Sequence, residues 1–425
     1  MIDIKQVREN PERFKDAAKA KHFDVDIDQL LQVDEALKSA KQQMQDISTE
    51  KNRIGKSIPK LSEDEKQSAL ARLSELKQQE AGYEVEIKKL QPKFEELMLL
   101  VAQPADEDVP FGEDDTQNVE IRREGKIRQF DFEPKDHVQL GLDLGIIDVE
   151  RGVKLAGTRN YFLKGDGARL HWAVLQFAVD SMVSKGYVPF SVPLLAKYDV
   201  MMGTGYYPGS EEQTYQMERD DLSLVGTAEV PLTAYHMGEI LRGEQLPLKY
   251  VALSTCFRRE AGAAGKDTYG LYRIHQFDKV EQVVICENNA EESRKYHDEI
   301  LANAEGVMQA LELPYRVVNV CTGDLGRGQA RKFDIEAWMP SRENYCETHS
   351  ASKFYEFQAR RMNLRYKDAV TKKNLFCHTL NNTVIASPRI LIPILELYQN
   401  ADGSITIPFV LQPYMNNRET ITKQT

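Results

Sequence analysis

Two stretches of heptad spacing between residues 28 and 103 most constrain how this chain of 425 residues can fold. In the first stretch, apolar side chains recur at intervals of mostly four and three residues from Val33 to Ile54, and in the second from Leu76 to Val101. This period of about 3.5 residues places each apolar set along one side of a helix. The spacing therefore predicts two long helices, each with an apolar side that needs a partner.

A short segment between these stretches predicts that the two helices pair with each other. The segment Gly55–Lys60 contains glycine and proline and is suited to a reversal, and Ser62 with Glu65 has the spacing of a capping box that begins the second helix. The result would be an antiparallel arm of roughly 45 Å, with Pro92 expected to kink its second helix. A coiled coil that only dimerises fits the same heptads, so periodicity does not decide what the arm contacts.

An acidic, proline-containing linker, Gln103–Gly112, separates this arm from a chain of different character. Beyond it, short alternating runs predict strands joined by turns, with helices between them. We therefore expect two domains, a helical arm in residues 1–110 and an α+β domain with an antiparallel sheet in residues 111–425. The clearest expected strands are Tyr250–Arg258 and Leu271–Cys286, and the clearest helices are Leu170–Lys185 and Ala290–Leu311.

Composition narrows the function classes. A net charge of −11 argues against a protein that coats DNA, although a local basic patch can still bind RNA. No run of about 20 apolar residues is present, so we expect no membrane partner. The five cysteines are scattered without a Cys-x-x-Cys pair, which disfavours a disulfide scaffold and a zinc site and fits the reducing cytoplasm.

The most informative segment is a predicted long hairpin around residues 256–281. Side chains alternate along a strand, so Arg258 and Glu260 are expected on one face of its first strand, and Arg273, Phe277 and Glu281 on one face of the second. One interpretation is a solvated face with salt bridges. The other is a nucleotide platform, where arginines bind phosphates, the ring stacks on a base and a carboxylate accepts from an exocyclic amine.

These residues belong to strings that resemble motif 2 of the class II aminoacyl-tRNA synthetases, in the form found in seryl-tRNA synthetases. The hairpin reads Phe257-Arg258-Arg259-Glu260, then a loop, then Gly270-Leu271-Tyr272-Arg273-Ile274-His275-Gln276-Phe277-Asp278-Lys279-Val280-Glu281. Other segments match the family in its order: Gly167–Lys185 with Gly186–Pro189 as motif 1, Thr227-Ala228-Glu229, Gly323–Gly326, Asp334–Pro340, Phe357–Arg361, and the N-terminal Asp3–Lys5 and Arg8–Pro11. The resemblance covers essentially the whole chain.

The resemblance implies an ATP-dependent serine–tRNA ligase that works as a homodimer. Serine would be activated as seryl-adenylate with release of pyrophosphate and then transferred to tRNA(Ser); whether tRNA(Sec) is also an acceptor stays open. Two alternatives remain. One is a paralogue that activates an amino acid for an acceptor other than tRNA, and the other is a non-catalytic coiled-coil RNA-binding protein.

The resemblance also implies roles for individual residues. Arg258 and Arg389 are the expected catalytic residues, and Glu347 with Ser350 would hold Mg²⁺. The implied ATP-binding residues are Arg258, Arg259, Glu260, Arg273, Ile274, Phe277, Glu347, Thr348, His349, Ser350 and Arg389. The implied serine-binding residues are Thr227, Ala228, Glu229, Arg258, Glu281, Asn381 and Thr383, with Thr227 and Glu229 expected on one strand face.

Three departures from the family pattern need a structural account. Motif 3 reads Asn381-Asn382-Thr383 and Pro388-Arg389 in place of Gly-Ser-Gly and Gly-Arg, and Pro393 follows. His349 stands in place of a serine, and the motif 2 loop has Lys266 and Tyr269 where arginines are frequent.

In this family the helical arm holds the long variable arm of the tRNA, so basic residues of the arm are candidate RNA contacts. The candidates are Lys51, Arg53, Lys56, Lys60, Arg72, Lys77, Lys88 and Lys89 in the arm, and Arg122, Arg123, Lys126 and Arg128 beyond the linker. Each of them is also suited to be an ordinary solvated charge.

Overall fold

The computed structural model describes residues 1–263, 265 and 267–423 and divides into two compact units, Ile2–Ala102 and Gln103–Thr425, with Met1 grouped with the second. We describe each unit by itself. None of the helices in the described part of the chain combines the length and apolar character needed to cross a membrane.

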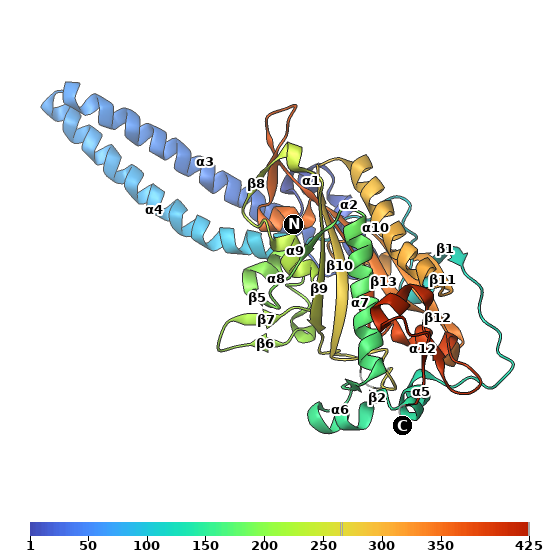
Figure 1. Cartoon of the computed structure of the whole chain (residues 1–425). Helices are drawn as coiled ribbons and strands as arrows, with labels where there is room; N and C mark the ends of the chain where they lie inside the picture. Colours follow the sequence, from blue (N-terminus) through green and yellow to red (C-terminus); the bar gives the residue numbers. More distant parts are fainter. Residues whose placement is uncertain (264, 266, 424–425) are drawn as a thin grey trace. The chain divides into compact units, whose positions relative to one another are not determined.

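The first unit is dominated by two antiparallel helices, α3 (Ile27–Ser57) and α4 (Glu63–Leu100), which lie side by side in Figure 1. Leu37, Ile47 and Leu76 are buried along the seam, as the heptads predict. The reversal is a single 3₁₀ turn, η1 (Ile58–Lys60). At the start of α4 the Glu65 carboxylate accepts from the Ser62 backbone N–H at 2.8 Å, which confirms this half of the predicted capping box. Helix α4 continues through Pro92.

Two short helices precede this pair, α1 (Ile4–Glu9) and α2 (Pro11–Ala20), and heptad analysis did not identify them. Of the candidate RNA contacts, Lys51 is paired with Glu80 at 2.5 Å and Arg72 with Glu50 at 3.0 Å, each across the two long helices. These two cations therefore have a function within the arm that sequence alone does not reveal.

The second unit is built on an eight-stranded sheet, antiparallel except at one edge, where β4 runs parallel to β9. This confirms the expected α+β class. The strand order is β1 (Val119–Glu124), β11 (Tyr315–Asn319), β12 (Arg331–Met339), β13 (Asn344–Tyr355), β16 (His378–Ser387), β10 (Gln276–Cys286), β9 (Leu248–Phe257) and β4 (Val188–Phe190). The predicted strand Leu271–Cys286 is five residues too long at its start, because residues 271–275 still belong to the loop.

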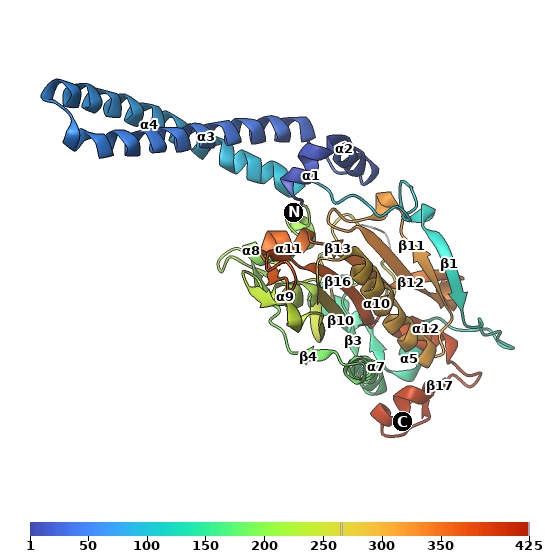
Figure 2. The same cartoon turned by 90° about the horizontal axis from the view of Figure 1, so that it is seen from above.

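Helices α7 (Asp166–Ser184) and α10 (Ala290–Ala310) cover one face of this sheet, as Figures 1 and 2 show. The main hydrophobic core lies between them and the strands, with Leu175, Val284, Ile300 and Val384 fully buried or nearly so. Helix α12 (Leu391–Leu397) contributes to the same core. The opposite face of the sheet is therefore left to carry polar side chains.

The remaining elements surround the sheet. The helices are α5 (His137–Leu144), α6 (Val149–Ala156), α8 (Tyr198–Thr204), α9 (Glu229–Ala234) and α11 (Phe357–Met362). The short strands are β2 (Ile147–Asp148), β3 (Phe162–Leu163), β5 (Leu195–Lys197), β6 (Gln216–Met217), β7 (Leu222–Leu224), β8 (Ile240–Arg242), β14 (Arg365–Lys367), β15 (Asn374–Phe376), β17 (Ile405–Thr406) and β18 (Thr420–Ile421). The cysteines are all free thiols, and only Cys346 is not buried.

Candidate active site

A cavity of about 850 Å³, including its open mouth, lies on the polar side of the sheet and brings together most of the predicted site residues. They come from α9, β10, β13 and β16 and from the segments that follow β9 and β16. The predicted residues that line it are Glu229, Arg258, Glu260, Ile274, Phe277, Glu281, Glu347, Thr348, Ser350, Asn381, Thr383 and Arg389.

Strand alternation explains how β10 supplies this wall. Phe277, Lys279 and Glu281 line the cavity. Val280, between Lys279 and Glu281, packs into the core beneath α7 and α10. Gln282, the residue after Glu281, donates to the Ile300 carbonyl of α10 at 2.9 Å. Neighbouring side chains thus face opposite sides, as the period of two requires.

The first half of the predicted hairpin differs from expectation. Strand β9 ends at Phe257, so Arg258 and Glu260 lie in the loop beyond it and not on one strand face. Glu260 has a φ of +53°, which turns the backbone where a strand would have continued straight. Both side chains nevertheless line the cavity, and the Arg258 guanidinium lies 5.2 Å from the centre of the Phe277 ring.

Two further predicted arginines do not line the cavity. Arg273 precedes β10 and is paired with Glu260 at 3.3 Å and with Asp267 at 3.6 Å, so it was wrong to place it on a strand face with Phe277. The Arg259 backbone N–H donates to the Gln213 carbonyl at 2.9 Å. In the motif 2 loop the Tyr269 hydroxyl donates to Asp136 at 3.1 Å, whereas Lys266 lies outside the described residues.

Arg389 is held at the cavity by backbone oxygens. Its Nε donates to the Tyr272 carbonyl at 3.1 Å and its Nη1 to the Glu347 carbonyl at 3.0 Å, and the guanidinium lies 4.3 Å from the centre of the Tyr272 ring. Pro393, whose effect on the following helix was in question, is the third residue of α12. The first N–H groups of a helix have no partner inside it, so a proline is tolerated there.

Glu347 and Ser350 form the acidic side of the cavity, and Asp334 lies beside both of them without lining it. Burial would raise the pKa of Glu347, but Arg389 and Lys332 lower it below the ordinary value. Burial raises the pKa of Asp334 to about 7 against the opposing effect of Lys332, 3.3 Å away. Glu347 is thus an ionised carboxylate that faces the cavity.

His349 faces away from this acidic side. Its ring contacts the Thr348 hydroxyl at 2.7 Å and the Val384 carbonyl of β16 at 3.0 Å, and burial lowers its pKa to about 4. The side chain is therefore a neutral link between strands β13 and β16, and it does not line the cavity where Thr348 and Ser350 do.

The innermost end of the cavity holds two carboxylates with fixed partners. Glu229 accepts from the Tyr206 hydroxyl at 3.0 Å and from the Gln358 amide at 2.8 Å. Burial, and then the charge of Glu281, raise the pKa of Glu229 to about 7. Glu281 is paired with Lys279 at 2.5 Å and lies 3.5 Å from the Thr383 hydroxyl.

The predicted strand around Thr227 is wrong. Glu229 is the first residue of helix α9, and its N–H donates to the Thr227 hydroxyl at 3.2 Å. Thr227 and Ala228 are almost fully buried and do not line the cavity. Thr227 thus fixes the start of the helix that presents Glu229.

Sequence reasoning missed several residues that line the cavity, among them Lys279, Tyr206 and Tyr272. Lys279 could have been found, because it alternates with Phe277 and Glu281 on one face. Tyr206 and Tyr272 had no such signal, since their places depend on loops.

Comparisons with known proteins agree along the whole chain. Residues 1–103 match the seryl-tRNA synthetase N-terminal domain, and residues 213–398 match the tRNA synthetase class II core domain (G, H, P, S and T). The serine–tRNA ligase of Deinococcus radiodurans is 44% identical over 421 residues, covering 99% of each chain. Two solved structures are also similar. The seryl-tRNA synthetase of Pyrococcus horikoshii in complex with ATP has a TM-score of 0.94 and 37% identity over 100% of both chains. The cytoplasmic serine–tRNA ligase of Naegleria fowleri in complex with AMP has a TM-score of 0.88 and 31% identity, covering 98% of this chain and 96% of that one.

Proposed function

This chain belongs to the seryl-tRNA synthetase family of class II aminoacyl-tRNA synthetases, and from that premise we propose that it is a serine–tRNA ligase. A serine carboxylate oxygen attacks the α-phosphorus of ATP, and pyrophosphate leaves as seryl-adenylate forms. A hydroxyl of the terminal ribose of tRNA(Ser) then attacks the acyl carbon, and AMP leaves. The observation that carries the proposal is that one cavity brings cationic, aromatic and carboxylate side chains together.

The nucleotide occupies the outer part of this cavity. Arg258 binds the α-phosphate, Phe277 stacks on adenine and Glu260 accepts from its exocyclic amine, while Arg389 binds the outer phosphates. Phosphoryl transfer depends mostly on positioned positive charge. The contacts of Arg389 with two backbone carbonyls support this role, because they hold a cation in place before ATP arrives.

Glu347 and Ser350 would hold Mg²⁺, which would neutralise part of the charge of the phosphates. The donor set fits, because Mg²⁺ prefers oxygen ligands and is often bound through one or two carboxylates together with substrate phosphates. The lowered pKa of Glu347 supports it, since its environment is cationic enough to keep the carboxylate ionised. Within residues 1–263, 265 and 267–423 no group of three His, Cys, Asp or Glu side chains could hold a metal ion by itself.

Serine occupies the inner end. Glu229 accepts from the α-amine, and Glu281 with Thr383 surrounds the hydroxyl. A site built around a hydroxyl leaves buried polar groups unpaired when alanine enters, which can cost a factor on the order of 10⁴ in rate. Rejection of threonine requires that the inner end leave no room for its additional methyl group.

The tRNA is bound by the N-terminal part, residues 1–110, and the reaction is catalysed by residues 111–425. Two copies form a homodimer through α7 and the adjoining β4 edge, where Trp172 is 64% and Val188 52% exposed. ATP and tRNA are cytosolic substrates, so the reaction takes place in the cytosol.

Affinity for tRNA(Ser) should fall steeply with salt, because phosphate contacts release counterions, while serine activation should not. The binding constant measured over a salt series tests this.

The decisive experiment is exchange of labelled pyrophosphate into ATP with serine, threonine or alanine. Serine-dependent exchange, followed by charging of tRNA(Ser), is the expected result. Exchange without charging would favour the paralogue that serves another acceptor, and no exchange with any amino acid would favour the non-catalytic alternative.

A further inference from the structure

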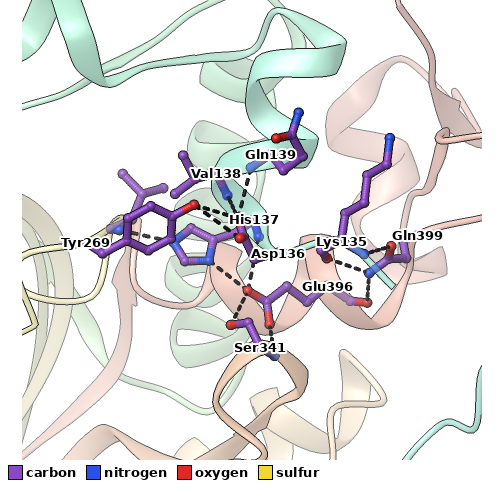
Figure 3. A network of polar contacts seen from close by, with 10 residues as sticks. Lys135, Asp136, His137, Val138, Gln139, Tyr269, Ser341, Glu396 and Gln399 are labelled. Carbon is purple, nitrogen blue, oxygen red and sulfur yellow. Dashed lines mark hydrogen bonds and ion pairs between the residues drawn. The ribbon is translucent and has the colours of Figure 1, made fainter. Parts of the chain in front are cut away.

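A buried polar network lies behind the cavity, where the first residue of α5 meets α12 (Figure 3). The His137 side chain is 5% and the Glu396 side chain 0% exposed, and the His137 Nδ1 lies 2.7 Å from a Glu396 carboxylate oxygen. Neither residue lines the cavity. Burial of this kind is expensive without a complete set of partners, so the contacts around the pair indicate what it holds in place.

Glu396 is supplied entirely with donors. Besides the imidazole, it accepts from the His137 backbone N–H at 3.1 Å, the Ser341 N–H at 2.9 Å and the Ser341 hydroxyl at 2.7 Å. One carboxylate thus joins α5, α12 and the turn η6 (Pro340–Arg342).

The other imidazole nitrogen contacts the motif 2 loop. The Leu271 backbone N–H donates to the His137 Nε2 at 3.2 Å, so this nitrogen is the acceptor and the ring is the neutral Nδ1–H tautomer. Gly270 has a φ of +74°, and a Cβ there would lie 2.1 Å from Nε2. Only glycine lets the backbone approach the ring so closely.

The residues that follow Leu271 contact Arg389, the arginine proposed to bind the outer phosphates of ATP. Leu271 lines the cavity, and the Tyr272 carbonyl accepts from Arg389. The guanidinium groups of Arg342 and Arg389 lie 4.1 and 4.3 Å from the centre of the Tyr272 ring. Arg342 follows Ser341, and Arg389 precedes the helix of Glu396, so both arginines belong to segments that the same carboxylate fixes.

We propose that His137, oriented by Glu396, is a positioning residue that fixes the end of the motif 2 loop and, through the Tyr272 carbonyl, the phosphate-binding Arg389. This inference rests on the proposed function of Arg389. It predicts a defect in ATP binding rather than in serine binding, because the serine residues Glu229 and Glu281 have no contact with this network.

Two substitutions separate the two hydrogen bonds of the ring. His137→Asn keeps a donor where Nδ1 stood but cannot reach Leu271, whereas His137→Gln puts an acceptor near the place of Nε2. In serine-dependent pyrophosphate exchange, His137→Asn should raise KM for ATP roughly tenfold, the effect of one lost hydrogen bond, and leave KM for serine unchanged. His137→Gln should recover part of the loss.

The matched control is His378→Asn. This histidine is equally buried, contacts the Ser293 hydroxyl at 2.5 Å and begins β16, at the opposite end of the strand from Arg389. It should lower thermal stability without changing KM for ATP. An unchanged KM in His137→Asn, or an equal change in both variants, would overturn the inference while wild-type exchange still upholds the ligase.

A measurement on the wild-type protein covers the case in which the variants fail to fold. Nitrogen NMR on protein with ¹⁵N-labelled histidine should show His137 as a neutral ring with its proton on Nδ1. A proton on Nε2 would remove the acceptor for the Leu271 N–H and would contradict the proposal.

Discussion

The helical arm and the catalytic sheet both contain many charged residues, but they use charge in opposite ways. In the arm, Lys51 and Arg72 reach glutamates on the facing helix, and these pairs are partly exposed to solvent. In the sheet unit, Arg258 and Glu347 line one cavity where each lies beside further charges. The two pairs of the arm are satisfied within the arm, whereas the cavity holds charges arranged for a ligand that enters.

This difference explains which substitutions should matter. An ion pair in contact with solvent gains only a weak attraction, so its removal changes the free energy of unfolding little. A charge held in a cavity cannot relax toward water, so its removal takes away stabilisation that water cannot replace. The comparison therefore predicts large effects on the sheet, an all-or-none effect for the arm as a whole, and small effects for single pairs in the arm.

The largest effect is expected for Arg258→Ala. Loss of the guanidinium beside Phe277 should lower serine-dependent pyrophosphate exchange by a factor on the order of 10³, with the thermal unfolding midpoint close to wild type. Steady-state exchange and calorimetry measure the two quantities. Retained exchange would mean that this charge is not used in the reaction and would contradict the difference between cavity charges and arm charges.

Removal of the arm, residues 28–103, should separate the two units by function. Exchange of pyrophosphate should continue, because the residues that line the cavity belong to the other unit. Charging of tRNA(Ser) should fall by a factor on the order of 10² or more, as expected when several phosphate contacts are lost. Equal loss of both activities, in a variant that keeps its fold by circular dichroism, would contradict this division.

The pH dependence of serine binding tests whether an ionised Glu229 in the cavity binds the α-amine. Because burial raises the pKa of Glu229 to about 7, the carboxylate becomes protonated as the pH falls through that value and loses its attraction for the α-amine. KM for serine in the exchange reaction should therefore rise up to about tenfold per pH unit below about 7. Glu229→Gln should show a high KM that does not vary with pH. A flat profile for wild type would refute the role of Glu229.

The smallest effect is expected for Arg72→Gln in the arm. The side chains of Arg72 and Glu50 are 43% and 32% exposed, so solvent screens the pair, and the thermal midpoint and the rate of exchange should both stay close to the wild-type values. Calorimetry of both proteins in low salt is the most sensitive comparison. A clear loss of stability would show that the arm depends on its charge pairs more than on residues such as Leu37 and Leu76.

The two regions also differ in how well the sequence predicted them. Heptad spacing predicted the pairing sides of α3 and α4, and the capping box at Ser62 predicted where α4 begins, because a local period and a local cap both depend on nearby residues. On the sheet, alternation predicted Phe277 and Glu281 correctly but misplaced Arg273, since nothing local marks Gln276 as the start of β10. The strand assigned to Thr227 failed because helix α9 begins at Glu229, whose N–H donates to the Thr227 hydroxyl.

Other parts of the site could not be inferred from any short stretch. His349 resembled an adenine contact by its place in a motif, but its ring bonds to Val384, a residue 35 positions away. His137 and Glu396 lie 259 residues apart, and only the packing of α5 against α12 brings them together. Such contacts depend on tertiary structure, which periodicity and motif spacing do not specify.

The inner end of the cavity has one more consequence, which concerns which molecules can enter it. When Glu229 is ionised, it and Glu281 bring two negative groups to the inner end and Lys279 brings one positive group, so this end is one positive charge short. An amino acid supplies that charge with its ammonium group. Glycerate or lactate, which share the carboxylate and a hydroxyl but lack the ammonium, would leave the deficit in place, so we expect both to be rejected by charge before shape is tested.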